Sequence, residues 1–149
     1  MTGCDEFRRD RGSAMIEFVV VGVGVLVPVA YLALAAVTVQ AAAFASTQAV
    51  REAARAFSTS TTAAEGRTRA LAAAELAFAD HGLTLPAGAV GIACAEGPCL
   101  SPGSAVVVDV SWSVRLPWLP ASVADGAAPT IPIEASQRVP IDDFRGDAT

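Results

Sequence analysis

The sequence contains no lysine and a single histidine, His81. Its ten cationic side chains are all arginine, they are scattered along the chain, and the formal net charge is −5 at pH 7. Nucleic-acid-binding domains carry clustered positive charge, so this composition argues against a nucleic-acid partner. The sequence also lacks a nucleophile elbow, a glycine-rich phosphate loop and a metal-spaced ligand cluster. We therefore expect neither an enzyme nor a bound cofactor or metal.

Cysteine is also scarce, with only Cys4, Cys94 and Cys99. Cys94 and Cys99 flank a turn-like insert, residues 95–98, which could bring the two thiols together. A disulfide there would place this part of the chain in an oxidising, exported compartment. Two free thiols in a cytosolic loop are the alternative. A metal site is disfavoured, because two cysteines and the distant His81 do not supply four ligands.

Charged residues are absent from a long stretch, residues 18–50. A membrane-spanning helix needs about 20 apolar residues, whereas the apolar region of a signal peptide has about 7–15. At about 1.5 Å per residue the stretch spans about 50 Å, so we expect a transmembrane helix that tilts or projects beyond the bilayer. A signal peptide cut near residues 41–43 is the alternative. Pro28 lies inside the stretch and is expected to kink the helix.

Downstream patterns predict a small folded head. Thr62 and Glu65 have the spacing of a capping box, and Gly82 is placed to end a helix that begins near Ala63. Beyond Leu83 the apolar period becomes two, which is typical of strands. The predicted class is α+β: a long N-terminal transmembrane helix, then a second helix packed on a small antiparallel sheet. We expect this helix at residues 63–81 and about three strands, at residues 90–94, 106–116 and 130–139.

The side chains of the predicted strands fall on two faces. Trp112 lies on the apolar face of the middle strand, whereas Asp109 lies on its polar face, where a solvated surface role is the default. Pro132 favours an edge position for the last strand. Trp112, Trp118 and residues 117–120 could together form a binding surface. Core packing and a strand-ending turn are the favoured roles for them.

Glu17 stands at the head of the apolar run, where an ionisable group is costly. No arginine within a turn downstream can pair with it. A cut between Gly12 and Ser13 would create a charged α-amine on Ser13. The amine of one subunit could then pair with Glu17 of its neighbour and align the two subunits along the helix axis. Such a pair specifies alignment even where it adds little net stability.

The stretch RGSAMIEFVVVG, followed by QAVREAARAF, resembles the TadE-type pseudopilins of the tight-adherence (Tad/Flp) type IV pilus systems. Gly12 and Ser13 match the family's cleavage junction, and Glu17 matches its characteristic acid. The resemblance implies that a prepilin peptidase cuts on the cytoplasmic side and that the head lies outside the membrane. The arginines flanking the apolar run do not decide this orientation themselves. Cleavage would also remove Cys4 with the leader and leave Cys94 and Cys99 where a disulfide can form.

The expected organisation is a prepilin-type leader at residues 1–12, a transmembrane and projecting helix at residues 13–57, and an exported α+β head at residues 58–149 with a flexible C-terminal tail. The expected function is that of a minor pseudopilin, inserted in the cytoplasmic membrane and possessing too large a head for a short major pilin. Its implied partners are the prepilin peptidase, other pilin subunits, the assembly platform and the lipid bilayer. The alternative is a permanently membrane-anchored extracytoplasmic binding module, in which the bond between Gly12 and Ser13 stays uncut.

Overall fold

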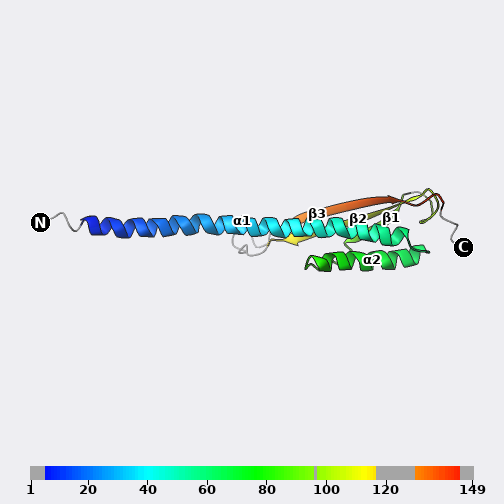
Figure 1. Cartoon of the computed structure of the whole chain (residues 1–149), viewed down its shortest axis with the longest axis horizontal. Coiled ribbons are helices and arrows are strands. Elements are labelled where there is room, and N and C mark those ends of the chain that lie inside the picture. Colours follow the sequence, from blue (N-terminus) through cyan, green and yellow to red (C-terminus); the bar gives the residue numbers. More distant parts are fainter. Residues whose placement is uncertain (1–5, 96, 117–129, 145–149) are drawn as a thin grey trace. The chain divides into compact units, whose positions relative to one another are not determined.

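The computed structural model describes the chain over residues 6–95, 97–116 and 130–144, with side chains from Ala14 onward. The chain order is two helices followed by three strands, and the sheet is antiparallel (Figure 1). The predicted α+β class is therefore confirmed. The chain divides into two compact units, Met1–Val37 and Thr38–Thr149. The elements are α1 (Glu6–Ser58), α2 (Ala63–Asp80), β1 (Val90–Cys94), β2 (Ala105–Arg115) and β3 (Thr130–Pro140).

The first unit contains the N-terminal part of α1, whose large apolar side chains are exposed. Leu26 and Leu32, for example, are 68% and 65% exposed. The helix from Ala14 to Ser58 is long and apolar enough to span a membrane. It continues unbroken past Pro28, so this proline does not end α1. The kink expected at Pro28 stays a prediction.

The second unit begins inside α1, at Thr38, where the side chains facing the interior become small and buried. The uncharged run at residues 18–50 therefore divides into an exposed apolar segment and a helix surface that belongs to a folded core. The expected boundary between the projecting helix and the head, after Phe57, stays a prediction. The buried residues of α1 are Ala42, Ala45, Ser46, Ala49, Val50, Ala53, Ala54 and Phe57.

A capping arrangement starts α2 as predicted. Thr62 accepts a hydrogen bond from the Glu65 backbone N–H at 3.2 Å. The Glu65 carboxylate in turn accepts from the hydroxyl and the N–H of Thr61 and pairs with Arg69 at 2.8 Å. The Thr61 hydroxyl, as the leading cause, lowers the pKa of Glu65. Past the end of α2 the chain turns at Gly82, whose φ of +68° lies in the left-handed region that glycine adopts without strain.

The sheet places β2 between β1 and β3. Val110 of β2 pairs with Val90 on one side and Ala135 on the other. Along β2 the side chains of Val106, Val108, Val110 and Val114 face the helices and are buried, while the alternate side chains, among them Asp109 and Arg115, face outward. This alternation is the predicted one. The strand ends within one residue of expectation, at Arg115.

Edge positions in β3 accommodate two prolines. The Ile141 N–H donates to the Ser104 carbonyl at 2.8 Å, which fixes which residues of this strand point their N–H groups toward β2. Successive residues of a strand point their nitrogens to alternate sides, and Pro132 and Pro140 are each an odd number of residues from Ile141. Their nitrogens therefore point away from β2, where no hydrogen bond of the sheet is lost. The predicted edge position of Pro132 is confirmed.

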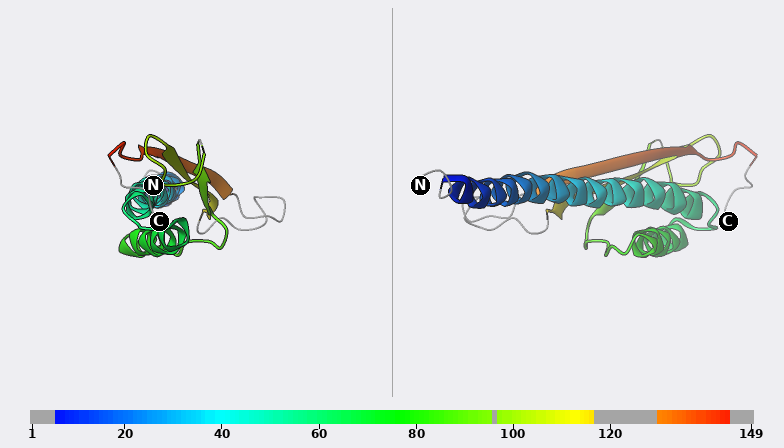
Figure 2. Two further views of the ribbon diagram at one scale, coloured as in Figure 1. Left: turned by 90° about the vertical axis from the view of Figure 1, so that its right-hand side faces the viewer. Right: turned by 60° about the vertical axis from the view of Figure 1, so that its left-hand side comes forward.

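Trp112 connects the sheet to both helices. Its indole Nε1–H donates to the Ser46 hydroxyl of α1 at 2.9 Å, and its ring meets Phe78 of α2 edge-on with centroids 5.3 Å apart. The two turned views show the sheet lying along α2 and the neighbouring part of α1 (Figure 2). The helix that begins at Ala63 is therefore not the sole cover of the sheet, because α1 contributes buried residues to the same core as α2.

Replacement of Ser46 by alanine is expected to lower the free energy of unfolding by about 1–3 kcal/mol, because the half-buried indole N–H loses its acceptor. Thr47→Ala is the matched control, since the Thr47 hydroxyl also donates to the carbonyl one turn back but is exposed. Its effect should stay within about 0.5 kcal/mol. Urea denaturation of the full chain in detergent, followed by near-ultraviolet circular dichroism, measures both. Equal losses in the two variants would contradict the role given to Ser46.

Candidate functional site

The proposed cleavage junction lies within α1. Gly12 and Ser13 come in its second turn, since the helix begins at Glu6. Glu17 follows Ser13 by one helical turn, so the two residues share a helix face. The Glu17 side chain is exposed, and among the described side chains none pairs with it.

Large apolar side chains surround Glu17. Met15, Ile16 and Phe18 are 73%, 68% and 78% exposed. Such a surface is unfavourable in water, and a carboxylate set in it is unfavourable in lipid. An arrangement of this kind is suited to a partner that covers the apolar side chains and supplies a cation.

Cys94 and Cys99 form a disulfide, with their Cα atoms 5.4 Å apart. This agrees with the sequence prediction and not with the alternative of two free thiols. The bond closes the end of β1 onto the β1–β2 connection. Leu100 follows directly, with a φ of +70° and its side chain buried in the core. The disulfide therefore holds in place the backbone that carries a buried side chain in an unfavourable conformation.

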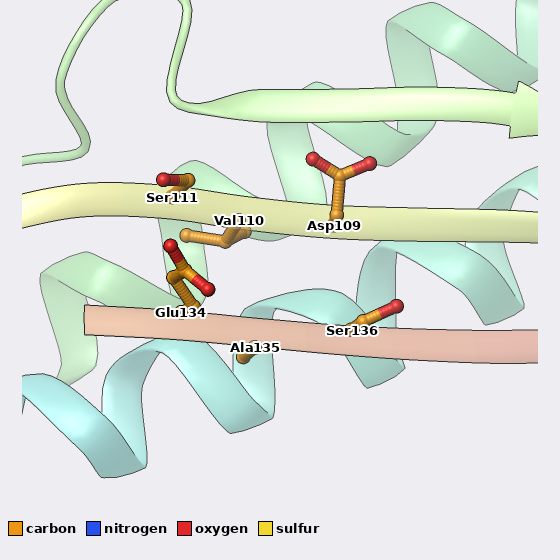
Figure 3. Close-up of a pocket in the computed structure, with 6 residues that line it drawn as sticks. All are labelled: Asp109, Val110, Ser111, Glu134, Ala135 and Ser136. Carbon is orange, nitrogen blue, oxygen red and sulfur yellow. The ribbon is translucent and has the colours of Figure 1, made fainter. Parts of the chain in front are cut away.

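A shallow depression crosses the outer face of the sheet (Figure 3). Asp109 and Glu134 line it together with serines. The Asp109 carboxylate leans toward β1, where Gly91 leaves room for it: a Cβ on Gly91 would lie 2.5 Å from both carboxylate oxygens. Among the described residues no three acidic, histidine or cysteine side chains converge on a metal-binding point. The depression is open and Asp109 is exposed in it, in keeping with the solvated role expected for this residue.

His81 closes the C-terminal end of α2, as its position in the sequence suggested. Its Nε2 lies 3.1 Å from Oε1 of Gln48, so the side chain ties the end of α2 to α1. A surface groove lies beside this contact, lined in part by Phe44 and Arg51. The arrangement explains His81 as a structural residue.

The structure tests the role expected for Trp112 but not the role expected for Trp118. Trp112 packs in the core, which confirms the favoured role, while Trp118 and residues 117–120 lie outside the described residues. Sequence reasoning missed Ser46, the hydroxyl that receives the Trp112 indole. The only indication in the sequence is that Ser46 lies at helical spacing from Ala42 and Ala49, which is a weak sign that its hydroxyl is buried.

Comparisons with protein-family models, with curated proteins and with solved structures find no match.

Removal of the disulfide by Cys94→Ser with Cys99→Ser is expected to lower the free energy of unfolding of the head by about 2 kcal/mol, the chain-entropy value for so short a loop. Thermal unfolding of the full chain in detergent measures the loss. The oxidised wild-type chain should alkylate only at Cys4, and the reduced chain at all three cysteines. Alkylation of three cysteines without a reductant would refute the bond.

Proposed function

We propose that this chain is a minor pseudopilin-like subunit that assembles or primes a Tad/Flp-type pilus and is processed by a prepilin peptidase. One observation carries the proposal. A Gly12–Ser13 junction and an exposed Glu17 stand at the head of an exposed apolar helix, and the same helix continues into a folded head.

The dimensions of α1 support insertion in a bilayer. Residues 18–37, from the residue after Glu17 to the end of the first compact unit, rise about 30 Å, which matches the hydrocarbon thickness of a bilayer. The helix needs no tilt to place Glu17 at one interface. The uncharged residues beyond Val37 are accounted for by the head core.

Glu17 acts as the registration group in this proposal. After cleavage the α-amine of Ser13 is charged, and Glu17 of an adjacent subunit is its partner. Both groups lie near the same interface, so pairing fixes the axial offset between neighbouring helices while their apolar surfaces pack. Specification of alignment is the best-attested use of such a buried pair.

The disulfide supports an exported head. Structural disulfides persist in oxidising compartments and are rare in the cytosol. With Cys94 and Cys99 on the far side of the span, the N-terminus is cytoplasmic, where the prepilin peptidase cuts. The second compact unit is a sizeable head, which favours a minor or priming subunit over a short major pilin.

Processing is tested by the N-terminus of the membrane-extracted protein. Coexpression with a cognate prepilin peptidase should produce a new start at Ser13, seen by intact mass and N-terminal sequencing. Gly12→Val should block the cut, because the peptidase must accommodate this residue at its scissile bond, while Gly3→Val should not. A start at Met1 or Thr2 in every case would favour the permanently anchored binding module. A cut near residues 43–46 would indicate a secreted protein.

Assembly is tested by Glu17→Gln, which keeps the size of the side chain and removes its charge. Incorporation into sheared pili should fall by at least about tenfold, since the buried amine loses its counter-charge, while cleavage at Ser13 persists. Glu75→Gln is the control, because Glu75 is an exposed acid of α2. Quantitative immunoblotting of the pilus fraction measures both variants. Unchanged incorporation of Glu17→Gln would exclude the registration role.

A further inference from the structure

One free edge of the sheet belongs to β1. The Ala95 N–H donates to the Ala105 carbonyl at 2.8 Å, and the Ser111 N–H donates to the Ala89 carbonyl at 2.9 Å. The odd-numbered residues of β1 therefore point their backbone groups toward β2, since successive residues of a strand point to alternate sides. The backbone groups of the even-numbered residues point away from β2, where no other described strand pairs with them. These residues are Val90, Ile92 and Cys94.

The free edge of β3 is protected, whereas that of β1 is not. Pro132 and Pro140 interrupt the row of N–H groups along the β3 edge, and the charges of Glu134 and Arg138 are exposed beside them. Proline and charge at an edge hinder the pairing of a further strand. β1, with the sequence VGIAC, has neither, and its protection is limited to its length of five residues. Its outward residues still offer three N–H and three C=O groups.

A carboxylate leans toward the same edge. Asp109 lies on β2 directly opposite Gly91 of β1, on the outer face of the sheet. Its carboxylate points toward β1 and away from β3, the strand that carries Arg138 (Figure 3). No cation among the described residues lies within ion-pair distance of it. Because Gly91 has no side chain, nothing on β1 separates this carboxylate from a strand added beyond the edge.

These two features specify the chemistry of a strand that pairs with β1. The residue opposite Gly91 in an added strand has its side chain on the outer face, about 5 Å from Gly91. A basic side chain at that position reaches the Asp109 carboxylate across the glycine and forms a charge-assisted hydrogen bond. The alternate residues of the added strand extend the other face, on which Val90 and Ile92 are half-buried against the core. Apolar side chains suit those positions.

We propose that the free edge of β1 binds an extended segment of a partner protein as an antiparallel strand, in which apolar residues alternate with polar ones and a basic residue opposite Gly91 pairs with Asp109. Main-chain hydrogen bonds along the edge supply the affinity, and the ion pair sets the register. A second copy of β1 does not fit, because VGIAC contains no basic residue. The inference needs only the folded head. It requires neither a membrane span nor peptidase processing, so it fails or succeeds separately from the proposed function.

The experiment uses a capped peptide of nine residues, two longer than β1 at each end. Valine alternates with threonine, and arginine replaces the central threonine. Amide hydrogen exchange in the full chain in detergent is followed by residue-resolved NMR. Saturating peptide should slow exchange of the Ile92 amide by about tenfold. The Ser136 amide is the matched control, because it points outward from the β3 edge, and its rate should not change. Equal slowing at both positions, or none at Ile92 with millimolar peptide, would overturn the proposal.

Backbone methylation of the peptide tests the strand pairing without altering the protein. In an antiparallel pair the nitrogens of the valines face β1, whereas those of the threonines and the arginine face away. N-methylation of the valines should therefore abolish binding, measured by fluorescence anisotropy of a labelled peptide, and N-methylation of the threonines should not. Equal effects would exclude an added antiparallel strand. Protection of the Ile92 amide without peptide, if it rises with protein concentration, would show that a second copy occupies the edge and would also overturn the proposal.

Charge variants test the basic residue. Asp109→Asn keeps the size of the side chain and should weaken binding of the arginine peptide by about fivefold, the upper range for an exposed ion pair. Glu134→Gln is the control, because Glu134 is the other acid of the same depression but lies on β3, and its affinity should not change. A peptide with glutamate in place of arginine should bind Asp109→Asn better than the wild-type chain. Equal affinity of the arginine peptide for wild type and Asp109→Asn would refute the pairing.

Discussion

The head depends on one helix surface made of small side chains. Ala42, Ala45, Ala49 and Ala53 of α1 are completely buried, which brings the helix backbone close to its neighbours. Larger side chains there would hold the sheet and α2 away and leave Trp112 without the Ser46 hydroxyl that it reaches at 2.9 Å. Because Trp112 also meets Phe78, this single indole links three elements that are far apart in sequence. Close packing around a directional bond gives the core a unique arrangement, which apolar burial alone does not.

The two parts of α1 have different surroundings. Up to Val37 its apolar side chains face outward, and from Thr38 its inner surface is the core of the head. One helix, α1, therefore contributes both the exposed apolar segment and part of the core of the head.

A disulfide and hydrogen bonds at the ends of α2 stabilise the parts of the head that lie away from Trp112. The Cys94–Cys99 bond constrains the β1–β2 connection, and Leu100 and Ile141 close the core there. At the start of α2 the Thr61 hydroxyl donates to the Glu65 carboxylate and the Thr62 hydroxyl accepts from the Glu65 N–H. At its end His81 contacts Gln48 of α1. These local contacts all lie away from the outer face of the sheet, on which Asp109, Glu134 and Ser136 are exposed.

Local chemistry in the sequence determined the elements and their order, because capping residues, the positive-φ glycine after α2 and the period of two in the strands act over a few residues. It also predicted the pairing of Cys94 with Cys99, with two free thiols as the alternative that the structure then excluded. Only the tertiary structure decided how the uncharged run is divided, since alanine suits a lipid-facing helix and a buried one equally well. It also decided that α1 shares the cover of the sheet with α2 and that Trp112 bonds to Ser46. That bond joins residues separated by 66 positions, and no local pattern specifies which hydroxyl will face the indole.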